Sequence, residues 1–266
     1  MIKPVFFTCA LFSAVWLLFS CTGSGNQPTS TATPLTFSMQ EYVFKKCLRD
    51  SVCAEINLKY PVFAGGPGAE AVKRLNDSIG VALYFAANAD HTLPLKTALD
   101  SAAAQLYATL KSDHEEGFAP GMSYTTELTS EVILQTAKLL SLQMDGYTFS
   151  GGAHGYYYTV LNTFDIGSAE SVLLTELITD TAALRPLLER AFVDAHAEEI
   201  ADAKLEDLLL DPEQPLPMPV NFCIVPSGIR FMYNPYEVAP YAVGQTDIVL
   251  SWELLGRLAD RKKWLD

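Results

Sequence analysis

The sequence predicts an α+β fold: an antiparallel sheet meander with helices packed on it, arranged as two related strand–helix–strand halves. Three observations predict it. Strand-like segments precede and follow a pair of amphipathic helical segments in the first half of the chain. A third helical segment in the second half is again followed by short segments rich in β-branched and aromatic residues. Helices that are grouped between strands, instead of alternating with them, favour α+β over a parallel α/β sheet.

The first half of the chain contains two predicted strands and two predicted helices. Residues 35–47 and 53–63 are rich in aromatic and β-branched side chains, as strands are. Residues 69–87 follow a helical period, and Pro94 opens a second helix that ends at 117–121. The apolar side chains expected to share the buried face of the first helix are Val72, Leu75, Ile79, Leu83 and Ala86.

A change of period marks the next elements. From Met122 the apolar residues alternate with period two, which predicts at least three antiparallel strands. Short turns are expected at 144–146 and 150–152, and a further strand at 156–164. In the second half, Thr181 is predicted to cap a helix. The last strands are expected at residues 220–225, 228–233 and 246–251.

The N-terminus has the pattern of an export signal that ends in a lipid attachment site. A single Lys3 precedes an uncharged apolar run at 5–19, which is too short for a spanning helix of roughly 20 residues. The run ends in Leu-Phe-Ser-Cys, which resembles the lipobox of bacterial lipoproteins and makes Cys21 the lipidated residue. A polar stretch follows, so residues 1–20 read as signal peptide and 21–34 as a flexible tether. The alternatives are an ordinary cleaved signal or a retained anchor.

The charge of the chain restricts its partners and its place in the cell. Removal of residues 1–20 takes away only Lys3, which leaves 17 basic and 31 acidic side chains, a net charge of 17 − 31 = −14. Nucleic acid is therefore excluded as a partner, because phosphates require clustered Lys and Arg. Anionic lipid would repel the domain, so attachment to a membrane falls to the N-terminal lipid. We expect a protein of the cell envelope, lipid-anchored and facing the periplasm or exterior, toward which a basic partner would be steered.

The cysteines indicate an oxidising compartment. Cys47 and Cys53 stand at the ends of two predicted strands, so a hairpin would bring them face to face as a disulfide. A metal site is the weaker interpretation, since no histidine lies nearby and the spacing fits no zinc knuckle. Cys223 lies in an apolar segment and is predicted to be a buried core thiol.

The densest unusual motif is Gly-Gly-Ala-His-Gly at 151–155, which three tyrosines follow. Its glycines imply positive φ or close backbone approach. His154 is either a ligand or general base in a pocket walled by tyrosines such as Tyr156, or a turn histidine that binds backbone. Metal-ligand spacings, nucleophile elbows and phosphate loops are missing from the sequence, so we expect no metal, no cofactor and no catalytic constellation.

A second motif follows the strand predicted at 228–233. It contains Asn234, Tyr236 and Glu237, with Glu237 flanked by aromatic residues and two prolines, and Asn-Pro starts a turn. Glu237 is either a carboxylate presented by a rigid loop or a buried structural carboxylate bonded to backbone amides. The sequence alone leaves both open. We predict that this motif and the glycine motif meet in space.

Together the two motifs resemble a known family. Gly-Gly-Ala-His-Gly, the Asn-Thr-Phe-Asp that ends at Asp165, and Asn-Pro-Tyr-Glu-Val-Ala-Pro-Tyr-Ala-x-Gly are similar to the RsiV-type extracellular domain, a largely uncharacterised family. Residues 53–63 and 75–79 resemble the N-terminal half of the deacetylase PdaC. The resemblance implies a PdaC-like half at 35–150, an RsiV-like half at 151–260, and an α+β fold outside the cytoplasmic membrane.

The resemblance also implies a function class. The best understood member of the family is the ectodomain of an anti-sigma factor that binds lysozyme, and in the PdaC-like case the hydrolase activity belongs to a separate domain. We therefore expect a non-enzymatic envelope module that binds a protein, such as a lysozyme-like one, or a cell-wall glycan. The alternative is an envelope hydrolase that uses His154 with Asp165 or Glu237, which requires the histidine to lie within hydrogen-bond reach of a carboxylate.

Overall fold

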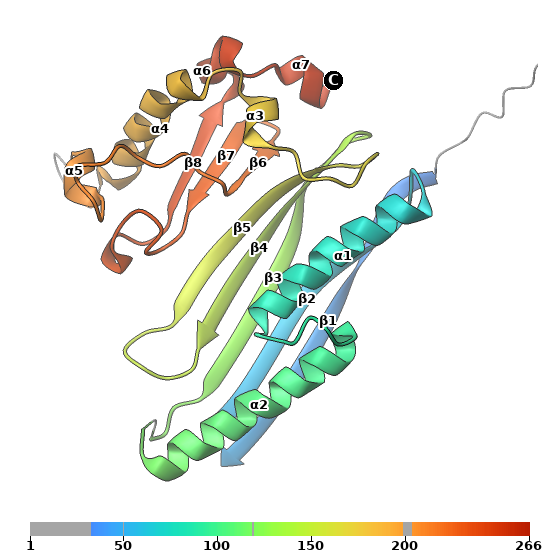
Figure 1. Ribbon diagram of the computed structural model, residues 1–266, viewed down its shortest axis with the longest axis vertical. Coiled ribbons are helices and arrows are strands. Elements are labelled where there is room, and N and C mark those ends of the chain that lie inside the picture. Colours follow the sequence, from blue (N-terminus) through green and yellow to red (C-terminus); the bar gives the residue numbers. More distant parts are fainter. Residues whose placement is uncertain (1–32, 50, 119, 199–203) are drawn as a thin grey trace, which may run out of the picture. The chain divides into compact units, whose positions relative to one another are not determined.

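Two β-sheets and the helices packed against them make up the part of the chain that the computed structural model describes, residues 33–49, 51–118, 120–198 and 204–266 (Figure 1). Cys21 and the predicted tether up to residue 32 lie outside these residues, so the signal, lipid and tether assignments stay predictions. None of the described helices is both long and apolar enough to span a membrane.

The larger sheet has five strands in the order β1-β2-β3-β4-β5 and is mixed. All neighbours are antiparallel except β2 and β3, which run parallel. The expected all-antiparallel meander is therefore wrong at this pair. The reason is that two helices carry the chain from the end of β2 back to the start of β3, as parallel pairing requires. The strands are β1 (Thr33–Arg49), β2 (Val52–Gly66), β3 (Tyr124–Gln135), β4 (Leu139–Phe149) and β5 (Tyr156–Asp165).

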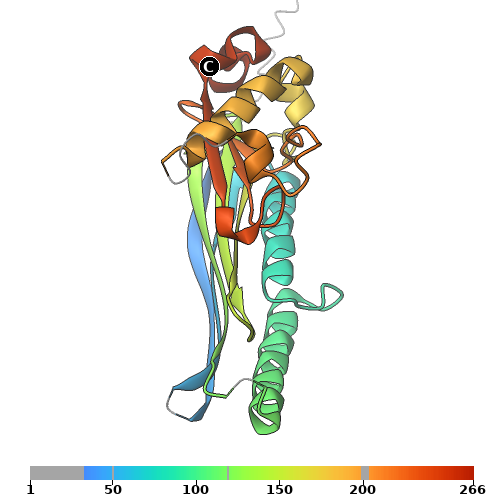
Figure 2. The ribbon, with the colours of Figure 1, turned by 90° about the vertical axis from the view of Figure 1, so that its left-hand side faces the viewer.

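Helices α1 (Ala69–Ala86) and α2 (Leu95–Glu116) lie on the same side of this sheet (Figure 2). Both predicted helices are confirmed, and Gly117 ends α2 in the left-handed conformation that glycine adopts readily (φ 80°). Most of the predicted stripe on α1 is buried, and it packs on apolar side chains of β2 and β3 in one core. Its fully buried members include Leu75, Leu83, Ile56, Leu58 and Leu128.

Strand β4 runs without a break through the turn predicted at residues 144–146. Gly146 lies opposite Tyr158 on β5, and a Cβ built on Gly146 would meet the Tyr158 Cζ at 2.2 Å. Glycine is required there because the tyrosine ring lies across the strand. The turn before β4 is closed instead by Thr136, whose hydroxyl accepts hydrogen bonds from the backbone amides of Lys138 and Leu139.

The C-terminal part forms a second core. It has a three-stranded antiparallel sheet in the order β6-β7-β8, which confirms the last three predicted strands. Helix α4 packs Leu184, Leu188 and Phe192 into this core. Asp180, one residue before the predicted Thr181, caps the helix by accepting a hydrogen bond from the amide of Ala183. The elements are α3 (Leu174–Leu177), α4 (Thr181–His196), α5 (Leu205–Leu208), β6 (Phe222–Val225), β7 (Gly228–Tyr233), η1 (Tyr241–Val243), β8 (Thr246–Ser251), α6 (Trp252–Leu255), η2 (Gly256–Leu258) and α7 (Arg261–Leu265).

The α+β class is confirmed, but the two parts are built differently. One has a five-stranded mixed sheet under two long helices, and the other has a three-stranded antiparallel sheet with α4 against it. The larger sheet also continues past residue 150 to Asp165. The pair of related strand–helix–strand halves expected from the sequence is not what the described residues form.

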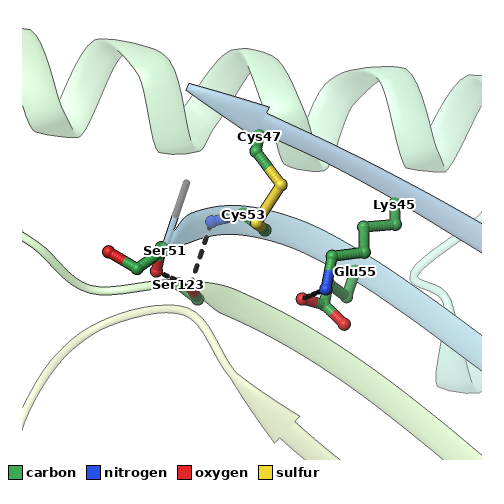
Figure 3. The surroundings of a disulfide bond; sticks show 6 residues. All are labelled: Lys45, Cys47, Ser51, Cys53, Glu55 and Ser123. Atoms are coloured by element: carbon green, nitrogen blue, oxygen red, sulfur yellow. Dashed lines mark hydrogen bonds and ion pairs between the residues drawn. A yellow bond between two sulfur atoms is a disulfide. The ribbon is translucent and has the colours of Figure 1, made fainter. Parts of the chain in front are cut away.

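The predicted disulfide is present. Cys47 and Cys53 face each other in the β1–β2 register with Cα atoms 3.9 Å apart, and their sulfur atoms are bonded (Figure 3). The Ser123 hydroxyl fastens the same end of the hairpin, since it accepts from the Cys53 amide and donates to the Ser51 carbonyl. Cys223 is buried as predicted, and burial raises the pKa of its thiol to about 12, so it stays protonated at neutral pH.

Candidate functional site

The glycine motif forms the connection between β4 and β5. Gly151 and Gly152 have φ values of 98° and 92°, which L side chains rarely adopt. A Cβ on Gly155 would lie 2.4 Å from the ring of Tyr147, so this glycine allows the backbone to rest on the aromatic ring. Positive φ and close approach, both expected from the sequence, therefore occur within one turn.

The second motif is clamped to β5 by the side chain of Asn234. The Asn234 carboxamide oxygen accepts from the Thr159 amide at 2.8 Å, and its nitrogen donates to the Thr159 carbonyl at 3.0 Å. The side-chain amide nitrogen of Gln245 also donates to the Asn234 side-chain oxygen, at 2.9 Å. A carboxamide presents one donor and one acceptor, as a peptide group does. Asn234 therefore occupies the free edge of β5 in the way that a neighbouring strand would.

Asn221 repeats this arrangement two residues further along β5. Its side chain accepts from the Leu161 amide and donates to the Thr159 carbonyl, both at 2.7 Å. Sequence reasoning did not single out Asn221 or Gln245. A weak signal existed for asparagine at strand ends, since Asn234 directly follows the strand predicted at 228–233 and Asn221 is the second residue of the strand predicted at 220–225.

The two motifs meet in space, as predicted. The Tyr241 hydroxyl donates to the Gly155 carbonyl at 2.9 Å, and the Tyr241 ring stacks on His154 with centroids 3.8 Å apart and planes 21° apart. The Tyr157 ring lies 5.7 Å from Tyr241 in an edge-on arrangement. Tyr157 and Tyr241 were missed as site residues, although Tyr241 stands inside the Asn-Pro motif.

Tyr236 extends this group of rings toward solvent. Its ring lies 5.5 Å from Tyr241, and 54% of the residue is exposed. Its φ of 66° is uncommon for a residue other than glycine, and it occurs in a turn closed by the hydrogen bond from the Tyr236 amide to the Ala239 carbonyl. We call this group of rings the aromatic platform; it consists of His154, Tyr157, Tyr236 and Tyr241.

The two carboxylates that the sequence suggested for this site, Glu237 and Asp165, accept hydrogen bonds that close local turns. Glu237 is exposed, not buried, and accepts from the Asn234 amide at 2.9 Å, so it stabilises the loop from outside. Asp165 closes a turn at the other end of β5 by accepting from the amide and the hydroxyl of Ser168. That end of β5 is about 30 Å from Tyr156, at ~3.3 Å per residue.

The pKa of Tyr156, which is partly exposed, is raised first by burial and then by the negative charge of Glu237.

His154 makes the backbone contact of a turn histidine. Its Nδ1 lies 3.0 Å from the Gly155 carbonyl, which can only accept, so the proton sits on that nitrogen. No described carboxylate is within hydrogen-bond reach of the ring, so the contact that the hydrolase hypothesis requires is not seen. Within the described ranges, no group of three or more His, Cys, Asp or Glu side chains is placed to hold a metal ion.

Comparison with known proteins agrees with the resemblance. Residues 48–157 match the model of the family described as "Deacetylase PdaC", and residues 175–253 match that of a protein family of unknown function, DUF3298. None of the curated proteins compared matches the chain. A DUF3298 family structure from Bacteroides fragilis has 18% identity and a TM-score of 0.68 over 86% of this chain and 95% of its own. Another from Pseudomonas aeruginosa has 18% identity, the same coverages and a TM-score of 0.57. Likeness at this identity shows the fold.

Proposed function

Because the chain joins a PdaC-type N-terminal region to a C-terminal region of the DUF3298 family, we propose that it is a non-enzymatic, lipid-anchored envelope protein that captures a basic protein. The aromatic platform is the proposed binding surface. The observation that carries the proposal is the stack of His154 on Tyr241 beside the exposed ring of Tyr236.

Two properties of the platform support recognition of a protein. Tyrosine rings held in fixed positions are enriched among the residues that dominate binding energy at interfaces. The rings are held by two segments that are themselves anchored, one by Asn234 on β5 and one by the bond from Tyr241 to Gly155. Little conformational entropy would then be lost when a partner binds.

Charge supports a basic partner. A net charge of −14 after removal of the signal raises the association rate of a cationic protein, while it gives little specificity by itself. Binding should therefore slow as salt increases, since ions screen exposed charges beyond about 10 Å at 0.1 M. A lysozyme-like muramidase is the basic envelope protein that the family resemblance suggests.

Membrane attachment through Cys21 is tested separately from binding, because the lipid site lies outside the described residues. Cys21→Ser should move the exported protein from the membrane to the soluble fraction and abolish labelling with a fatty-acid analogue. Fractionation with immunoblotting checks the first result and in-gel fluorescence the second. Unchanged labelling and partition would contradict the lipid anchor without touching the binding proposal.

The binding surface is tested with Tyr236→Gly. Glycine adopts a φ of 66° readily, so this change removes the ring and should alter the free energy of unfolding by less than about 1 kcal/mol, because relief of backbone strain offsets the entropy cost of glycine. Titration calorimetry with purified lysozyme should show at least about tenfold weaker binding, which is ~1.4 kcal/mol. Leu254→Ala is the matched control, since Leu254 on α6 is 53% exposed and lies outside the platform.

Equal affinity of the Tyr236→Gly protein and the unchanged protein, or an equal loss in Leu254→Ala, would contradict the platform as the binding surface. Soluble peptidoglycan fragments are titrated in parallel. If they bind with the same dependence on Tyr236 while lysozyme does not, the platform is a glycan site and the proposed protein partner is wrong.

A further inference from the structure

A groove runs along the helix side of the five-stranded sheet, away from the aromatic platform. Helix α1 lies mainly on β2 and β3, and the groove is between α1 and the neighbouring face of β4 and β5. The groove has a volume of about 300 Å³. Its walls come from α1 on one side and from the strands on the other: Ser78, Val81, Ala82 and Phe85 on α1, and Leu128, Leu142, Met144, Tyr158, Val160, Asn162 and Phe164 on β3, β4 and β5.

The groove is apolar and partly open to solvent. Phe85 is 73% exposed and Val81 67%, and Val160 on the opposite wall is 40% exposed. None of the described side chains that line the groove carries a charge, although the chain has 31 acidic residues. These three apolar side chains lose the stabilisation that burial would give, and exposed apolar side chains beside a groove are typical of a ligand site.

The groove is long and narrow. Its lining residues on β5 run from Tyr158 to Phe164, about 20 Å at ~3.3 Å per residue. On α1 they run from Ser78 to Phe85, about 10 Å at ~1.5 Å per residue. A volume of 300 Å³ spread over about 10–20 Å suits an unbranched chain better than a ring system.

Tyr158 joins this groove to a second cavity of about 360 Å³, because it and Phe85 line both. The second cavity is more polar, and none of its lining side chains in the described part of the chain is charged. Its polar side chains include Asn88, Gln105, Thr109, Thr126, Thr148 and Ser150.

The Tyr158 hydroxyl is the second observation that indicates a ligand. Tyr158 is only 7% exposed, and among the described residues its hydroxyl is buried without a hydrogen-bond partner. The ring lies over Gly146, where a Cβ would clash, so the sequence provides room for this position. A buried hydroxyl without a partner is unfavourable, and it becomes favourable when a ligand oxygen accepts its proton.

We propose that the groove binds a neutral single-chain amphiphile. Its alkyl or acyl chain lies between α1 and β5, its uncharged polar head occupies the second cavity, and an ester or ether oxygen at the junction accepts a hydrogen bond from the Tyr158 hydroxyl. A neutral head group is favoured because none of the described lining side chains carries a charge that could pair with either an anionic or a cationic head. This site is separate from the platform and does not depend on its proposed function.

The test uses the exported Cys21→Ser protein, which can be purified without detergent. Hexyl, heptyl and octyl glucoside are titrated below their micelle concentrations by calorimetry, with glucose as the head group alone. The dissociation constant should fall about fourfold for each added methylene, the factor expected when a CH₂ group leaves water. Glucose alone should give no measurable binding at the same concentrations.

Two variants test the site itself. Phe85→Ala should weaken octyl glucoside binding at least about tenfold, while Phe118→Ala, a matched change at a residue that is 76% exposed and lines neither cavity, should leave it unchanged. Tyr158→Phe should weaken binding of all three glucosides by the same factor, because it removes the head-group bond and leaves the chain contacts. Thermal unfolding of each variant confirms that it is folded.

Three results would overturn the proposal: affinity that does not depend on chain length, equal losses in Phe85→Ala and Phe118→Ala, or no binding of any glucoside. Binding of a soluble chitooligosaccharide that Phe85→Ala weakens, without binding of octyl glucoside, would assign the cavities to a glycan and would equally overturn it.

Discussion

Asn234→Ala should lower the free energy of unfolding by about 2–3 kcal/mol. The change removes the two bonds to Thr159 and the bond from Gln245, and it leaves the Thr159 amide without its partner. Thr159 is 4% exposed, so water cannot readily replace the lost acceptor. An unsatisfied buried donor costs about 1–3 kcal/mol, and the loop that Asn234 ties down is freed in addition. Urea denaturation followed by circular dichroism measures the difference.

Gln40→Ala is the control for this prediction. Gln40 is an exposed residue on β1 whose side chain, among the described residues, bonds only to the Ser38 hydroxyl at 3.3 Å, so its loss should change stability by less than about 0.5 kcal/mol. Similar losses in the two variants would show that the clamp on β5 contributes nothing beyond the removal of a surface amide. The Asn234 variant should also bind lysozyme more weakly, because the platform loses one of its anchors.

Gly228→Ala should lower the free energy of unfolding at least as much as Asn234→Ala, by about 3 kcal/mol. A Cβ on Gly228 would lie 2.0 Å from the Leu250 carbonyl oxygen and 2.8 Å from its carbonyl carbon, both on the neighbouring strand β8. These atoms belong to the backbone of a paired strand, so they cannot move aside as the end of a side chain could. Overpacking of this kind typically costs about 1–3 kcal/mol and sometimes more. Equilibrium unfolding in urea gives the value.

The same substitution at Gly80 should have the opposite sign. Gly80 lies inside α1, and a Cβ built there meets nothing within 4 Å. Alanine should raise stability by about 0.5–1 kcal/mol, since it restricts the unfolded chain and favours the helix. No loss of stability at Gly228 would contradict the argument from the close approach of β8, and a loss at Gly80 would contradict the argument from open space and helix propensity.

Some features of the fold and site could be predicted from local pattern. The stripe at 72–86 predicted α1, since helical periodicity is a relation between residues three and four apart. Cys47 and Cys53 could be paired because a short hairpin brings strand ends together whatever the rest of the chain does. The contact between the glycine motif and the Asn-Pro motif was also predictable, because the residue types in these two segments are more specific than a helix or a strand needs.

Other features depend on residues far apart in the sequence. Gly146 resembles a turn residue in its local context, yet it lies within β4 because the ring of Tyr158, twelve positions later, crosses it. The exposure of Glu237 follows from how the Asn234 loop docks on β5, and no neighbour in sequence reveals it. The parallel pairing of β2 with β3 likewise depends on where two helices return the chain.

The sequence by itself therefore determined the α+β class, the main helices, the disulfide and the two motifs that meet. Each of these follows from interactions between residues close in the chain or from rules of residue type at a turn. The tertiary structure alone decided the parallel strand pair, the asparagine side chains that close the edge of β5, and the apolar groove beside α1. These depend on which distant surfaces are brought into contact and which are left uncovered, and no short-range pattern encodes that outcome.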